Sequence, residues 1–209
     1  MIELNSKFRI PRQGFTVIDL LVSAVVIIIM LSFVLANFRT AQSSGEIDVA
    51  IKQVVDKIRT VRNLSLGGQL LADDTFPDGG YGVYFKSNEP DNDRIQLYAA
   101  LDEVNNGFDP EQILTNQTVI FNNITITDLC GLTADEVVDL PCQGAWQDAG
   151  NYLEAIYRET GSVLANYGQG SGFKHVGGVM TSSKTGQQAY FYISLISGAV
   201  TGDLYDRTN

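Results

Sequence analysis

The stretch GFTVIDLLVSAVVIIIMLSFVLANF, residues 14–38, decides the fold of this 209-residue chain. From Phe15 to Phe38 the only charged side chain is Asp19. At ~1.5 Å per residue, a helix of roughly 20 apolar residues crosses a bilayer core of about 30 Å. The stretch therefore predicts a transmembrane helix over residues 15–38, with one carboxylate near its start.

The residues before this stretch, 1–14, form a basic leader. Lys7, Arg9 and Arg12 stand against a single acid, Glu3. Because positive flanks stay on the cytoplasmic side, we expect the leader inside and the rest of the chain outside, with one pass through the inner membrane. An ordinary secretory signal has a shorter apolar core that ends in a small-residue cleavage site, so we expect this span to be retained.

The helical pattern continues over residues 39–66 but becomes amphipathic. Apolar residues follow alternating spacings of four and three at Ile47, Ile51, Val54, Ile58 and Val61. This spacing predicts one apolar stripe, which should pack on the sheet of a globular head. The pair Gly67-Gly68 predicts the end of the helix.

Beyond Gly68, short apolar segments alternate with Gly, Pro, Asn and Asp clusters, a pattern typical of an antiparallel sheet. The candidate strands are 82–85, 95–99, 117–121, 124–126, 155–158, 176–180 and 188–194. Together with the long helix they predict an α+β fold whose β-rich head spans residues 67–209.

The two cysteines of the chain, Cys130 and Cys142, lie in an insertion-like segment between Asn122 and Trp146. Both fall in the part of the chain predicted to leave the cytosol, where a disulfide can form. A bond that closes so short a loop contributes ~3 kcal/mol in the chain-entropy model. We expect a disulfide that holds a surface excursion, with two independent thiols as the alternative.

The sequence from Gly14 to Val22 resembles the prepilin cleavage motif of type IV pilins and type II secretion pseudopilins. The resemblance implies that a prepilin peptidase cleaves after Gly14 and that the new N-terminal residue, Phe15, is methylated. It also implies that Asp19, the fifth residue of the mature chain, guides assembly by pairing with the terminal amine of a neighbouring subunit. Family members usually carry Glu there, and many carry Pro where this chain has Ala36.

The head also resembles pseudopilin H and FimT-like minor pilins in two segments, Ile156–Val163 and Ile193–Val200. The resemblance implies a structural subunit, major or minor, of a type IV pilus or type II secretion-like filament. Its implied partners are copies of itself or other pilins, the prepilin peptidase, the inner-membrane assembly platform, and membrane lipid before assembly. Its implied location is first the inner membrane and then a cell-surface or periplasmic filament.

Two other functions stay open. A minor pilin could bind DNA or a surface through its head, although the net charge of −10 argues against a nucleic-acid surface. The chain could also be a membrane-anchored extracytoplasmic domain outside any filament.

The sequence offers little for catalysis or metal binding. The single His175 and two cysteines are too few for a zinc site, and Ser171, Ser182 and Ser183 have no nucleophile-elbow context. The acidic loop Glu89–Asp93 matches no EF-hand, so we expect a solvated loop rather than a calcium site. We therefore expect no enzyme activity, no cofactor and no metal.

Overall fold

The structure is a computed structural model of the chain. It describes residues 16–71, 74–101, 114, 118–137, 139–170 and 172–205, and over residues 36–44 it describes the backbone alone. The chain divides into two compact units, Met1–Ala41 and Gln42–Asn209.

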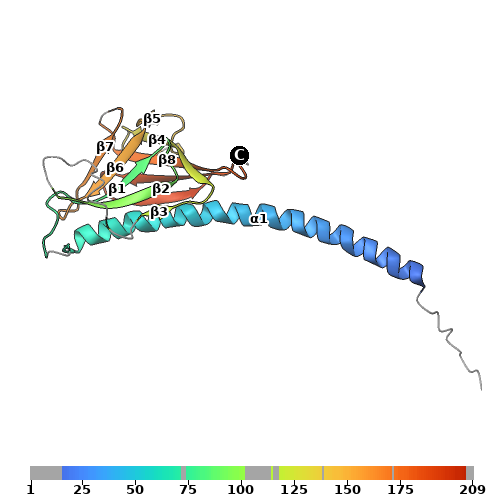
Figure 1. The fold of residues 1–209 in the computed structure, drawn as a ribbon. Helices are drawn as coiled ribbons and strands as arrows, with labels where there is room; N and C mark the ends of the chain where they lie inside the picture. Colours follow the sequence, from blue (N-terminus) through green and yellow to red (C-terminus); the bar gives the residue numbers. More distant parts are fainter. Residues whose placement is uncertain are drawn as a thin grey trace, which may run out of the picture. The chain divides into compact units, whose positions relative to one another are not determined.

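One long helix, α1 (Val17–Leu66), contributes residues to both units (Figure 1). It ends directly before the predicted glycine pair. Gly68 adopts a left-handed φ of 60° and its N–H donates to the carbonyl of Ser65, while the N–H of Gln69 donates to the carbonyl of Leu64 over 3.1 Å. These two bonds satisfy carbonyls that the helix end would otherwise leave open, as in a Schellman motif. The predicted helix stop is confirmed.

The described residues of the second unit form two five-stranded antiparallel sheets (Figure 1). Sheet A has the order β3 (Val119–Ile120), β2 (Arg94–Ala100), β1 (Gly80–Lys86), β6 (Tyr152–Tyr157) and β7 (Val163–Tyr167). Sheet B has the order β10 (Val200–Leu204), β9 (Gln188–Ser194), β8 (His175–Ser182), β4 (Ile124–Leu132) and β5 (Gln147–Asp148). The chain is an α+β protein, as expected.

Every predicted strand overlaps an observed one, but the prediction did not include β5, β7 and β10. The strand predicted over 124–126 is also too short, because β4 continues to Leu132. A register shift between Ile126 and Asp128 lets the strand continue past the point where its simple alternation breaks down.

Sheets A and B face each other across an apolar core. Phe85 of β1 and Phe191 of β9 stack with ring centroids 4.6 Å apart. The predicted stripe of α1 belongs to the same core, with five side chains at most 1% exposed: Ile47, Ile51, Val54, Ile58 and Val61. Since full burial of one such side chain stabilises a fold by about 1.5–3 kcal/mol, this half of α1 is an integral part of the head.

Hydrogen bonds tie the end of α1 to both sheets. The Ser65 hydroxyl donates to the carbonyl of Tyr157 in β6, and the Arg62 guanidinium donates to the carbonyl of Ser197 over 3.3 Å. The Tyr157 hydroxyl donates to the carbonyl of Gly198 over 3.4 Å. Burial raises the pKa of Tyr157, so this phenol remains a donor well into the alkaline range.

The outer face of sheet A carries a small second cluster around Tyr98, which is fully buried. Its ring lies against Gly82 of the neighbouring strand β1, where an added Cβ would be 2.4 Å from the ring. Glycine is required at position 82 because the ring occupies the space of a side chain. Burial, and secondarily the charge of Glu154, raise the pKa of Tyr98.

Candidate functional site: the apolar half of the helix and its carboxylate

The residues Val17–Leu35 of α1 present a continuous apolar surface. None of this 19-residue segment is buried. Its large apolar side chains are 45–82% exposed at Val17, Ile18, Leu20, Leu21, Val22, Val25, Val26, Ile27, Ile28, Ile29, Met30, Leu31, Phe33, Val34 and Leu35. By length and composition this segment could cross a membrane, which fits a single-pass anchor.

The carboxylate of Asp19 caps the start of this helix. The Thr16 N–H and hydroxyl both donate to its Oδ2, over 3.1 and 2.7 Å, and the Asp19 N–H donates back to the Thr16 hydroxyl over 3.2 Å. This reciprocal pattern is a capping box with Asp in place of the usual Glu. The sequence signal, Thr-x-x-Asp before an apolar run, was present but was not used to predict a cap.

The cap lowers the cost of placing the Asp19 carboxylate in an apolar surrounding. A bare acid in a membrane span is costly, whereas this one already accepts two hydrogen bonds from its own chain. Farther along, Ser23 and Ser32 donate their hydroxyls to the carbonyls of Asp19 and Ile28, four residues back, over 2.7 and 2.8 Å. The described polar side chains of the segment are thus bonded within the helix, as a lipid environment requires.

The predicted peptidase cleavage site and methylation site, Gly14 and Phe15, lie outside the described residues. The cleavage and the methylation therefore stay predictions. Of the predicted site residues in the N-terminal part of the chain, Asp19 is the one that the structure describes.

The predicted disulfide is confirmed. Cys130 in β4 and Cys142 in the following loop are bonded, with their Cα atoms 5.3 Å apart, and no free cysteine remains. Cys130 is buried, while Cys142 is half-buried. The bond holds the loop against sheet B.

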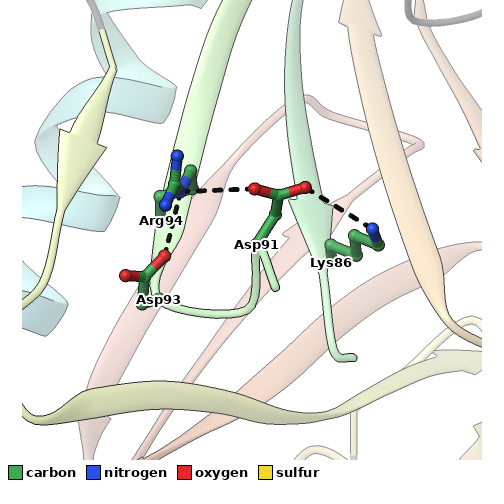
Figure 2. Close-up of polar contacts among 4 residues, drawn as sticks. All are labelled: Lys86, Asp91, Asp93 and Arg94. Atoms are coloured by element: carbon green, nitrogen blue, oxygen red, sulfur yellow. Dashed lines mark hydrogen bonds and ion pairs between the residues drawn. The ribbon is translucent and has the colours of Figure 1, made fainter. Parts of the chain in front are cut away.

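The acidic loop between β1 and β2 lies at the surface, with residues 88–90 exposed, and two of its acids form ion pairs. Figure 2 shows Asp91 between Lys86 and Arg94, at 3.5 and 3.7 Å, and Asp93 2.9 Å from Arg94. The hydrogen bond that Arg94 donates to the Asp93 carboxylate raises the pKa of Arg94. Two cations therefore neutralise the two acids, and no described group of three or more His, Cys, Asp or Glu residues is placed to hold a metal.

His175 lies in sheet B and is buried, 6% exposed. Its Nε2 lies 3.1 Å from the carbonyl of Asp135, which can only accept, so the ring donates through Nε2. Ser182 stands at the opposite end of β8, seven residues away, or about 23 Å along an extended strand. These two residues therefore form no Ser-His pair.

An open groove of about 820 Å³ lies in the second unit, and no sequence motif indicates it. One side is α1, and the other side is the β3–β4 turn and Lys184. Glu46 and Lys184 form an ion pair of 3.2 Å at this groove. The lining residues are Gly45, Glu46, Val49, Ala50, Gln53, Ile120, Phe121, Asn122, Asn123, Ile124 and Lys184.

Comparison of the chain with protein-family models, with curated proteins and with solved structures found no significant match.

Proposed function

We propose that this chain is a pilin-like subunit, held in the inner membrane as a precursor and assembled through α1 into an extracytoplasmic filament. The observation that carries the proposal is the capped carboxylate of Asp19 at the start of the exposed apolar segment Val17–Leu35. It lies five residues after Gly14, where the prepilin resemblance places an acid.

The exposed segment Val17–Leu35 needs a surrounding that is not water. Its fifteen exposed large apolar side chains exceed any patch that a soluble monomer normally tolerates. Lipid would cover the segment in the precursor, and the same segments of other copies would cover it in the filament. Transfer between these two apolar surroundings changes the hydrophobic free energy little, so packing and polar contacts decide assembly.

Asp19 is the polar contact that would guide this transfer. Cleavage after Gly14 would create an ammonium group on Phe15 of each subunit. A carboxylate buried among apolar helices is costly unless a cation pairs with it, and the terminal amine of a neighbouring copy is such a cation. The cap from Thr16 uses Oδ2 and leaves acceptor capacity on the carboxylate for this amine.

The head supports a pilin-like architecture. The second half of α1 packs into a β-rich head through the predicted stripe. The two segments that resemble pseudopilin H and FimT-like pilins contain the turns of two antiparallel hairpins, β6–β7 with Gly161 at a φ of 80° and β9–β10 with Gly198 at a φ of 67°.

Two measurements test the proposal. Mass spectrometry of the purified chain should find Phe15 at the mature N-terminus, with or without a methyl group. An intact Met1 would instead indicate a membrane-anchored domain outside any filament.

The second measurement is the amount of each variant in filaments sheared from cells that do not produce the wild-type chain. Asp19→Ala should be cleaved normally but lost from filaments, because the docking charge is gone. Asp19→Glu should restore incorporation, since it keeps the charge. Normal incorporation of Asp19→Ala would refute the docking role.

A further inference from the structure

The loop between β4 and β5, residues 133–146, is referred to as the strap. Its described residues form neither helix nor strand, and most of them are exposed. It lies over the outer face of sheet B, because it contacts His175 and Tyr192, which alternate along their strands with the core residues Val176 and Phe191. None of its described side chains belongs to the main core.

The strap instead closes a small cluster of its own. Trp146 is its main buried side chain, 8% exposed, and packs with Cys130 and Leu132 of β4. The Trp146 ring meets Tyr192 edge-on at 6.2 Å, and its indole N–H donates to the carbonyl of Asp139 over 3.2 Å. This cluster is separate from the core that joins the two sheets and α1, so the head can keep its core while the cluster opens.

Few noncovalent contacts hold the strap on the sheet. Asp135 forms a 2.6 Å ion pair with Lys174, but both side chains are largely exposed, so the pair contributes little. The His175 ring donates to the Asp135 carbonyl, and the Tyr205 hydroxyl donates to the Pro141 carbonyl. Among the described residues, the packing of Trp146 adds to these contacts, and the covalent attachment is the Cys130–Cys142 disulfide.

We propose that the strap is a redox-controlled cover. It is closed when the disulfide is formed and opens as a unit on reduction, while sheets A and B remain intact. Without the covalent bond, the strap gains the conformational freedom of a long loop, and the small Trp146 cluster does not offset that gain. Opening uncovers the aromatic and imidazole side chains of Tyr192 and His175.

The chemistry is a thiol–disulfide exchange with a dithiol reductant. A thiolate of the reductant attacks Sγ of the half-buried Cys142, the S–S bond breaks, and Cys130 leaves as a thiolate that takes up a proton. The second thiol of the reductant then displaces Cys142 and closes its own disulfide. Two electrons and two protons pass from the reductant to the strap, and an oxidising disulfide donor reverses the exchange when the strap closes.

The proposed membrane topology links closure of the strap to export of the head. This link alone rests on the proposed function. The head would meet oxidising conditions only after it has crossed the membrane. A closed strap would therefore mark a head that has been exported, and a head retained in the cytosol would keep an open strap.

The strap can be followed in the full chain in detergent micelles through Trp146, the single tryptophan. Acrylamide quenching of its fluorescence reports exposure, and hydrogen exchange of the β8 and β9 amides reports whether sheet B stays folded. Reduction with a dithiol, or the Cys130→Ser/Cys142→Ser double variant, should raise the quenching constant severalfold and leave the exchange protection of β8 and β9 unchanged. Tyr205→Phe, which removes one anchor and keeps the disulfide, should leave Trp146 protected.

Three outcomes would overturn the proposal. Trp146 could stay protected after reduction, which would show that the strap docks without the disulfide. Sheet B could lose protection together with Trp146, which would show that the strap is not a separate unit. Tyr205→Phe could expose Trp146 as much as reduction does, which would show that the disulfide does not control closure. None of these outcomes bears on filament assembly, which is tested separately by Asp19.

Discussion

The two halves of α1 share one secondary structure but present opposite surfaces. From Val17 to Leu35 apolar side chains cover the helix all round and are exposed, whereas from Ile47 to Val61 they form one stripe and are buried. Both halves therefore form a helix although one is apolar all round and the other is amphipathic. What differs is the surrounding that each half requires: an apolar one for the first, and the faces of two sheets for the second. The pattern of side chains, rather than helix propensity, distinguishes the half of α1 that could cross a membrane from the half that packs in the head.

A matched pair of isoleucine substitutions should break this comparison most strongly. Ile58→Ala removes a fully buried side chain and should destabilise the head by about 2–5 kcal/mol. Ile28→Ala, at a residue 63% exposed, should change head stability by less than about 0.5 kcal/mol. Urea unfolding of the full chain in detergent, followed by far-UV circular dichroism, measures both. Equal effects would mean that the first half also packs in the head.

The next largest effect should come from alkaline pH, which should lower the stability of the head, because all tyrosines of the chain lie there and none lies in α1. Burial raises the pKa of Tyr98 and Tyr157 above the ordinary value of about 10. The folded head therefore holds these protons more tightly than the unfolded chain. That stabilisation is complete below pH ~10 and is lost as the pH rises toward the folded pKa, at up to about 1.4 kcal/mol per pH unit for each tyrosine.

The measurement is the urea midpoint of the head at pH 8 and pH 11, with the absorbance of tyrosinate as a second reporter. The midpoint should fall at pH 11, and Tyr157→Phe should make the fall shallower because one titrating group is gone. A midpoint independent of pH would contradict the burial of these phenols.

Local patterns were enough to predict α1, its stripe, its end and the disulfide. Each of these depends on residues close in sequence, such as the four-three spacing from Ile47 to Val61 or the glycines after Leu66. The Asp19 cap is equally local, but the prediction did not include it, because the cap depends on Thr16 and Asp19 together rather than on the charge of the acid.

The division into two sheets could not be predicted in this way, because strand order is set by pairing between distant segments. β1 pairs with its sequence neighbour β2 on one side and with the distant strand β6 on the other. β5 is only two residues long, which is too short for a sequence pattern to indicate. β10 carries a Gly and an Asp, which favour a turn in the sequence and become a strand only through its partner β9. The ion pairs of Asp91 likewise depend on Lys86 and Arg94 lying on adjacent strands.

Two glycine-to-alanine substitutions in and after the second half of α1 should change the stability of the head in opposite directions. Gly68 has a φ of 60°, so Gly68→Ala should destabilise the head by roughly 1–2 kcal/mol. Gly45 lies within the helix with open space around its missing Cβ, so Gly45→Ala should stabilise it by about 0.5–1 kcal/mol. The two urea midpoints, compared with wild type, measure the difference. A loss of stability in Gly45→Ala would indicate a contact at the groove that needs the glycine.

The smallest effect concerns the start of the apolar half, where capping and charge can be separated. Thr16→Ala removes the hydroxyl that bonds Asp19 but keeps the charge, and should weaken the first turn by about 1 kcal/mol. Exchange of the Asp19 amide in micelles should then accelerate, while incorporation into filaments should stay close to wild type. Asp19→Asn keeps a side-chain oxygen for the cap and removes the charge, so it should leave the exchange rate nearly unchanged and impair incorporation. If Thr16→Ala abolished incorporation and Asp19→Asn did not, the carboxylate would act by capping the helix rather than by pairing with an amine.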